Sequence, residues 1–169
     1  MPVVNIFICP RRGNVVSLQF NMDATNIQLR EHPDGHREVL DPVRKRWVAL
    51  TPEEWVRQQT ICLLHDRYDY PLELMQVEGA ITVNGQTRRC DIVVYDTDGR
   101  PHLIVECKRP DVPINQKVCD QACRYNTVLQ VPLLLLTNGK QQIVIEIDYR
   151  NRSLRQLPSI PFFLNNVKP

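Results

Sequence analysis

The chain has 169 residues, and its 21 Lys and Arg residues against 19 Asp and Glu residues give a formal net charge of +2. This length suits one domain with a sizeable core, and so small a net charge does not by itself indicate a nucleic-acid partner. No apolar run approaches the length of a membrane span, and the first nine residues lack the basic start of a signal peptide. We therefore expect a cytoplasmic location and no membrane partner.

The first fifty residues are predicted to form an N-terminal β-rich appendage (residues 1–50) packed on a core. Within it, residues 15–20 are predicted to form a strand, and residues 37–40 are expected to pair with residues 46–50. Asp34-Gly35 is typical of a turn.

A helix is predicted from Thr51 to about Tyr68. Thr51 is typical of an N-cap, Pro52 suits the first helical position, and Glu54 would complete a capping box. Pro71 prevents the helix from continuing. Five apolar residues recur at helical spacing and should face the core: Trp55, Val56, Cys62, Leu63 and Leu64.

Three antiparallel strands are expected next. A strand over residues 74–83 should be broken or bulged at Gly79, and Asn84-Gly85 is typical of a hairpin turn into a strand over residues 89–96. Asp98-Gly99 between two β-type apolar runs predicts a second hairpin, which is the strongest local signal in the chain.

A second helix is predicted from Pro113 to about Leu129. Its apolar stripe consists of Val118, Ala122, Tyr125 and Leu129. A near-continuous apolar run over residues 131–137 predicts a buried strand, and residues 142–148 predict another. Residues 150–169 are interpreted as a C-terminal tail.

These elements define an α/β protein. The order of the central part, residues 51–149, is α-β-β-β-α-β, with a mixed sheet flanked by helices. The strand after the second helix should cross over and lie parallel to an earlier strand.

The second hairpin brings three charged side chains together. If Asp98 and Gly99 are the two loop residues, counting outward pairs Asp91 with Glu106. Directly opposite residues share a face, with Cβ atoms about 4.5–5.5 Å apart, and Lys108 lies on the same face two positions beyond Glu106. One turn therefore gathers two carboxylates and an ammonium.

Two interpretations of this cluster remain open. Two bare carboxylates so close repel each other, so that one becomes protonated or both bind a cation such as a divalent metal. The alternative is a pair of solvated strand positions with a cross-strand ion pair. The flanking strands look buried on both faces, which favours the first interpretation, because charges at the ends of buried strands are rarely incidental.

The six cysteines are interpreted as thiols. In the same register Cys90 would face Cys107, on the side opposite the carboxylates. Cys119 and Cys123 are one helical turn apart and could in principle bind zinc, but no second pair accompanies them, so we expect no zinc site at these cysteines.

The stretch from Thr51 to Gly139, about half of the chain, resembles the PD-(D/E)xK nuclease superfamily, and more closely the N-terminal nuclease domain of type I restriction enzyme R subunits. Four segments within it carry the resemblance. The segments are Thr51-Pro52-Glu53-Glu54-Trp55-Val56-Arg57, Arg88-Arg89-Cys90-Asp91-Ile92-Val93-Val94-Tyr95, Leu103-Ile104-Val105-Glu106-Cys107-Lys108 and Asp120-Gln121-Ala122-Cys123-Arg124-Tyr125-Asn126. The last segment fits the QxxxY element of these nucleases. The fold implied is a restriction-endonuclease-like core.

The resemblance implies a role for each acidic residue. Asp91 and Glu106 would hold Mg²⁺, with Mn²⁺ as an alternative, and Lys108 would position the attacking water and stabilise developing negative charge. Glu54 would match an acidic residue of the first helix that assists some members; its structural alternative is the capping box.

Four further residues are candidates for contacting DNA or supporting the site. Gln121 and Tyr125 would face the site or the DNA backbone; the alternatives are an exposed helix position for Gln121 and core packing for Tyr125. Of the basic clusters, only those containing Arg89 and Arg109 lie beside the carboxylates. The Arg11 and Arg44 clusters are interpreted as solvated turns.

Two departures from the family pattern limit the prediction. The proline that names the superfamily is absent, since Cys90 precedes Asp91, and many members also lack this proline. The sequence contains no G-x-x-x-x-G-K-[ST] phosphate loop, so we expect no ATP site and no DNA translocation by this chain itself. The predicted function is a Mg²⁺-dependent deoxyribonuclease that acts on DNA, alone or with other restriction subunits, with oligomerisation left open. The alternative is a non-catalytic module that binds nucleic acid or a partner within a restriction complex.

Overall fold

The computed structural model describes residues 27–83 and 85–163, except for the side chains of Val83, Gln86, Arg88, Arg124, Tyr125, Thr127 and Val128. It begins with a three-stranded antiparallel sheet of β1 (Leu29–Glu31), β2 (Arg37–Asp41) and β3 (Arg46–Ala49). The predicted pairing of residues 37–40 with residues 46–50 is confirmed. The strand predicted at residues 15–20 lies outside the described residues.

Helix α1 (Pro52–Tyr68) has the predicted bounds, because its ends carry strong signals. Thr51 Oγ1 accepts a hydrogen bond from the Glu54 N–H at 3.0 Å, and Asp69 ends the helix in the left-handed region at φ 61°. The capping box is only half formed, however. The Thr51 N–H donates to the Ala49 carbonyl, and the Glu54 carboxylate binds basic side chains instead.

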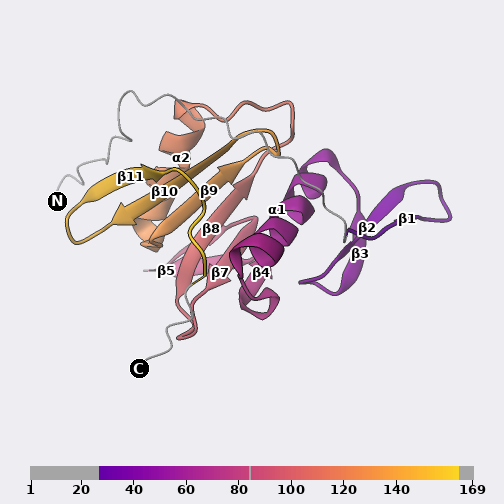
Figure 1. The fold of residues 1–169 in the computed structure, drawn as a ribbon, viewed down its shortest axis with the longest axis horizontal. Coiled ribbons are helices and arrows are strands. Elements are labelled where there is room, and N and C mark those ends of the chain that lie inside the picture. The colour runs from indigo at the N-terminus through magenta and orange to yellow at the C-terminus, as the bar shows by residue number, and fades with distance from the viewer. Residues whose placement is uncertain (1–26, 84, 164–169) are drawn as a thin grey trace.

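The main sheet has six strands in the order β11-β10-β9-β8-β7-β4 (Figure 1). Their bounds are β4 Met75–Val77, β7 Ile92–Tyr95, β8 Pro101–Cys107, β9 Leu133–Thr137, β10 Gln142–Asp148 and β11 Ser153–Leu157. The β8–β9 pair is parallel and the other neighbours are antiparallel. Strand β9 follows the second helix, so the predicted crossover is confirmed. Strand β11 was not predicted.

The strand predicted over residues 89–96 is present only as β7, at residues 92–95. Its predicted start is wrong, because the chain leaves one sheet and enters another at Cys90-Asp91. Strands β5 (Ala80–Val83) and β6 (Gln86–Arg89) form a separate two-stranded ribbon. Two backbone hydrogen bonds hold the crossing point, from Cys90 N–H to the Gly79 carbonyl at 2.9 Å and from Glu78 N–H to the Asp91 carbonyl at 2.8 Å. After a 3-10 turn (Leu72–Leu74), β4 therefore pairs directly with β7. The predicted α-β-β-β-α-β order is confirmed, with the β5–β6 ribbon inserted between β4 and β7.

The hairpin between β7 and β8 differs from the predicted two-residue loop. Asp96 N–H bonds to the Arg100 carbonyl, so three residues form the loop, with Gly99 at φ 76°. The register then shifts by one residue between Val94 and Tyr95. This one-residue shift offsets the third residue of the loop, so Val93 pairs with Ile104 as predicted.

One helix covers each face of the main sheet, α1 in front and α2 (Gln116–Leu129) behind in Figure 1. The predicted start of α2 at Pro113 is wrong, because Asn115 Oδ1 caps the helix by accepting from the Val118 N–H at 3.2 Å. No helix in the described part of the chain is long and apolar enough to cross a membrane.

Two hydrophobic clusters fill the spaces between sheet and helices. The α1 face contains Val56, Ile61, Leu64, Ile92, Val94, Leu103, Val105 and Cys107, and the α2 face contains Cys90, Val93, Ile104, Ala122, Cys123, Leu129, Leu134 and Leu136. Cys90 and Cys107 are buried thiols as predicted, but they lie on opposite faces. The side-chain alternation of β7 does not extend to Cys90, since that strand begins only at Ile92.

Candidate active site

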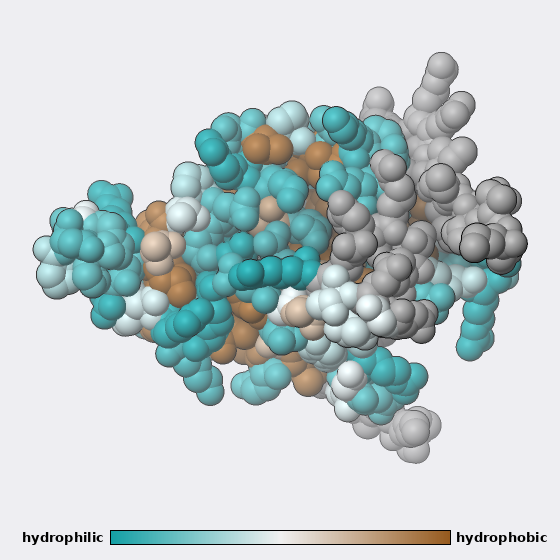
Figure 2. Space-filling model, turned by 180° about the vertical axis from the view of Figure 1, so that it is seen from behind, coloured by the Kyte–Doolittle hydropathy of each residue, from teal (hydrophilic) through white to brown (hydrophobic). Residues whose placement is uncertain are grey.

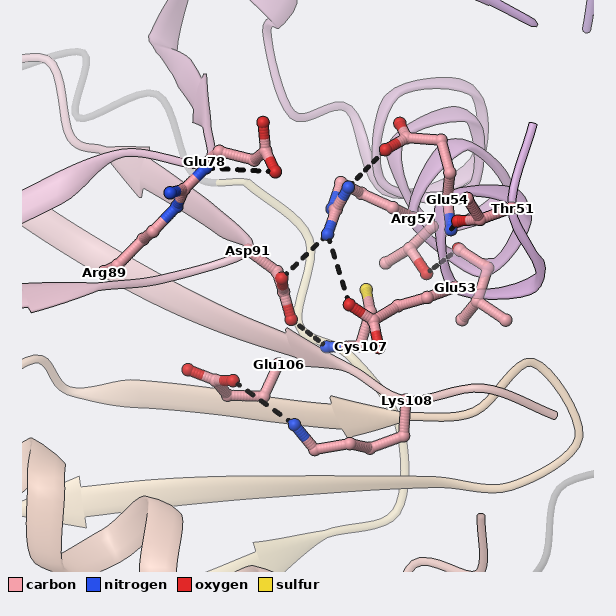
Figure 3. A network of polar contacts seen from close by, with 12 residues as sticks. Thr51, Glu53, Glu54, Arg57, Glu78, Arg89, Asp91, Glu106, Cys107 and Lys108 are labelled. Carbon is pink, nitrogen blue, oxygen red and sulfur yellow. Dashed lines mark hydrogen bonds and ion pairs between the residues drawn. The ribbon is translucent and has the colours of Figure 1, made fainter. Parts of the chain in front are cut away.

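Asp91 lies at the crossing point between the two sheets, directly before β7 (Figure 3). Its Oδ2 accepts a hydrogen bond from the Cys107 N–H of β8 at 2.6 Å, and its Oδ1 accepts from Arg57 Nη2 of α1 at 2.9 Å. The carboxylate is therefore held from two sides, by a strand backbone and by a helix side chain. A carboxylate oxygen has two lone pairs, so each oxygen keeps one for a further ligand.

Glu106 and Lys108 lie on the side of Asp91 away from Arg57 (Figure 3), with 3.9 Å between Lys108 Nζ and Glu106 Oε2. The Glu106 side chain is 27% exposed and points to the α2 face, where it lines a cavity of about 140 Å³. Burial, followed by repulsion from Asp91, raises the pKa of Glu106 to about 7, against the opposing effect of Lys108. The hairpin thus gathers the three predicted charges, and the two carboxylates interact.

This raised pKa predicts a pH-dependent stability. Because the folded-state pKa of about 7 exceeds the ordinary value of 4.5, the folded protein binds more protons than the unfolded chain between these pH values. The free energy of unfolding must then fall as pH rises through this range. Glu106→Gln removes the effect, so we expect it to stabilise the protein by about 2 kcal/mol at pH 8 and to have little effect near pH 4.

Urea unfolding without divalent ions measures this difference. The matched control is Glu73→Gln, a substitution of an exposed glutamate in the 3-10 turn, which should shift stability little at either pH. An equal effect of Glu106→Gln at both pH values would contradict the coupling.

The predicted residue Glu54 lies in an ion-pair network that reaches Asp91. Six residues alternate in charge along it: Arg89, Glu78, Arg44, Glu54, Arg57 and Asp91. Glu54 is buried at 6% exposure and binds Arg57 Nη1, Arg44 Nη2 at 2.5 Å and Gln58 Nε2 at 2.8 Å. Its connection to the site is therefore indirect, through Arg57.

Arg44 was wrongly interpreted as part of a solvated turn. It lies in the β2–β3 turn with a side chain only 13% exposed, and it contacts three carboxylates. Arg44 Nε lies 2.6 Å from Asp41 Oδ2 and Nη1 lies 2.9 Å from Glu78 Oε2, besides the contact with Glu54. Asp41 itself is fully buried and also accepts from Gln58 at 2.8 Å. The N-terminal sheet thus contributes to the surroundings of the site.

The sequence carried a partial signal for these missed residues. Arg57 and Gln58 follow Glu54 by three and four positions, which places them on one side of a helix. No pattern linked Arg44 to Glu54, because the contact depends on how the N-terminal sheet packs against α1.

The remaining predicted candidates are Arg89, Arg109, Gln121 and Tyr125. Arg89 is exposed and pairs with Glu78 at 3.2 Å, and Arg109 is exposed and pairs with Asp111 at 2.9 Å. Gln121 of α2 lines a hollow of about 70 Å³ together with Glu106 and Lys108. The side chain of Tyr125 lies outside the described part of the structure.

The family model for the type I restriction enzyme R protein N terminus matches residues 52–161. This match spans well over half of the chain, from α1 through β11. The fold defines an α/β protein that has a mixed sheet with one helix on each face and an acidic pair at a strand end. The chain belongs to the family of type I restriction enzyme R protein N termini.

Among solved structures, the chain is similar to a fragment of a putative HsdR subunit of a type I restriction enzyme from Vibrio vulnificus YJ016. The two are 20% identical with a TM-score of 0.41, over 60% of this chain and 22% of that chain. The chain thus spans about a fifth of the length of that structure. No curated protein sequence matches significantly.

Proposed function

We propose that the chain is a metal-dependent nuclease that hydrolyses DNA phosphodiester bonds. The observation that carries this proposal is the β7–β8 hairpin, which brings Asp91, Glu106 and Lys108 together at one end of the main sheet. Membership of a restriction enzyme family supports DNA as the substrate and other restriction subunits as partners.

The residues present fit a divalent cation. Asp91 and Glu106 offer hard oxygen ligands of the kind that Mg²⁺ prefers, and each Asp91 oxygen keeps a lone pair beside its hydrogen bond. A bound Mg²⁺ or Mn²⁺ would polarise a phosphate oxygen and lower the pKa of a water molecule.

The surrounding cations have distinct roles in this proposal. Lys108 is exposed enough, at 37% of its side chain, to contact a phosphate or a water molecule beside Glu106. Its ammonium would stabilise negative charge that develops in the transition state. Arg57 is 5% exposed and holds Asp91 in place, so it is a positioning residue.

The exposed basic residues flank this centre. Arg89 is the last residue of the β5–β6 ribbon and Arg109 follows the end of β8, and both are proposed to contact the DNA backbone. Gln121 is proposed to act from the α2 side, where it shares a hollow with Glu106 and Lys108. The same role for Tyr125 stays a prediction.

Calorimetry with Mg²⁺, combined with a cleavage assay, tests whether Lys108 acts in cleavage and not in metal binding. Lys108→Ala removes a charge but no metal ligand, so we expect it to bind Mg²⁺ at least as tightly as the wild type. Its cleavage rate should fall about 10²–10³-fold, the usual cost of one transition-state charge donor.

The control is Arg100→Ala, which removes an exposed cation from the other end of the same hairpin. It should change neither metal binding nor cleavage. A folded wild-type protein that binds no Mg²⁺ or Mn²⁺ at millimolar concentration would instead support the non-catalytic binding module.

A further inference from the structure

A second group of metal-ligand side chains lies far along the chain from Asp91, at the tip of the β1–β2 hairpin. The hairpin projects from the body at the right of Figure 1 and, seen from behind, forms the hydrophilic lobe at the left of Figure 2. Its tip has the sequence His32-Pro33-Asp34-Gly35-His36. One ligand atom each from His32, Asp34 and His36 lies within 4.8 Å of the others.

The hairpin register explains why these side chains meet. The last paired residues are Glu31 and Arg37, and the His32 N–H then donates to the His36 carbonyl at 2.8 Å. His32 and His36 are therefore opposite each other and share a face of the ribbon. The turn between them is closed by the Gly35 N–H on the His32 carbonyl at 2.8 Å, with Gly35 at φ 91°.

The Asp34 carboxylate lies between the two imidazoles. Asp34 Oδ1 is 3.0 Å from His32 Nδ1, contacts His36 Nδ1 and also accepts from the His36 N–H at 3.2 Å. The local turn thus holds the carboxylate where both rings reach it, without help from the rest of the fold.

A fourth residue is placed to orient one of these rings. Glu38 lies in β2, two positions after His36, and its Oε1 is 3.7 Å from His36 Nε2. Arg30 Nε holds the other Glu38 oxygen at 2.6 Å. Metal-bound histidines commonly donate their second ring N–H to such a carboxylate, which leaves the other nitrogen free for the ion.

We propose that His32, Asp34 and His36 form a binding site for a borderline transition-metal ion such as Zn²⁺. Two imidazoles and a carboxylate suit Zn²⁺, whereas the all-oxygen pair at Asp91 suits Mg²⁺. Three protein ligands leave one coordination position for water or for a donor from a partner.

Binding requires a rotation of the rings. They are stacked with centroids 4.4 Å apart and planes 20° from parallel, so their in-plane lone pairs do not yet converge on one point. The His32 and His36 side chains are 40% and 44% exposed, and rotation about exposed side-chain bonds is fast. The turn therefore brings the three ligands together, and the bound ion would orient the two rings toward itself.

Titration with Zn²⁺ tests this site separately from the carboxylate centre. The protein is the full chain without a histidine tag, with Glu106→Gln to weaken the other site. We expect one Zn²⁺ ion per chain with an affinity that falls about tenfold or more for His36→Ala and for His32→Ala. His65→Ala, a substitution of an exposed histidine of α1, is the matched control and should leave the affinity unchanged.

Two further readouts exclude the cysteines and the carboxylate centre as the source of the signal. Co²⁺ in place of Zn²⁺ should show no thiolate charge-transfer band, and millimolar Mg²⁺ should not displace Zn²⁺. The proposal is overturned if no saturable binding occurs, or if His32→Ala and His36→Ala bind Zn²⁺ as tightly as the control His65→Ala.

Discussion

Glu106→Gln is expected to abolish metal-dependent DNA cleavage while leaving the fold intact. The substitution keeps the shape of the side chain but removes one of the two charges that would hold the cation. Because the ion supplies both phosphate polarisation and the activated water, cleavage should fall by about 10³-fold or more. The measurement is the rate of plasmid DNA cleavage at a metal concentration that saturates the wild-type protein.

This loss of activity should accompany a gain in stability. Burial of Glu106, followed by repulsion from Asp91, raises its pKa to about 7, so the neutral side chain relieves an unfavourable interaction near neutral pH. A residue that costs stability and is required for activity is typical of a functional site. A variant that cut DNA at the wild-type rate would exclude Glu106 as a metal ligand.

The largest expected effect on stability comes from Arg44→Met. The substitution preserves most of the aliphatic volume but leaves the carboxylates of Asp41, Glu54 and Glu78 without their shared cation. Breaking a buried ion pair by removing one partner typically costs about 3–5 kcal/mol. Urea unfolding at pH 7 measures the loss.

The matched control is Arg109→Met. Arg109 also pairs with a carboxylate, Asp111 at 2.9 Å, but both side chains are more than half exposed. Exposed pairs contribute about 0–1 kcal/mol, so this variant should unfold almost like the wild type. Similar losses for the two variants would mean that the network around Arg44 is not more strongly coupled than a surface pair.

Local signals predicted the site well where they acted over short distances. Thr51 and Pro52 predicted the start of α1, and the Asp98-Gly99 turn predicted the Val93–Ile104 pairing that brings Asp91 near Glu106. The turn itself was predicted with two residues rather than three, but the bulge between Val94 and Tyr95 restored the register. The apolar pairs Val93–Ile104 and Ile92–Val105 require this register, because a slip by one residue would turn every side chain to the other face.

Contacts between distant elements could not be predicted from one sequence. The break at Cys90-Asp91 depends on the β5–β6 ribbon leaving the main sheet, which the pattern of residues 89–96 does not reveal. Strand β11 alternates poorly and has an exposed edge, so its Ser153–Leu157 segment resembles a tail. Arg44 acquires its partners only when the N-terminal sheet meets α1.

Cleavage of DNA by the purified wild-type chain tests the central claim most directly. Linear, circular and single-stranded DNA would be incubated with Mg²⁺, with Mn²⁺ or with a chelator, and Glu106→Gln would serve as the control. We predict cleavage of at least one substrate by the wild type with either metal, and none with the chelator or with the variant. Metal binding without cleavage of any substrate, or cleavage that Glu106→Gln retains, would contradict a nuclease centre built on Asp91, Glu106 and Lys108.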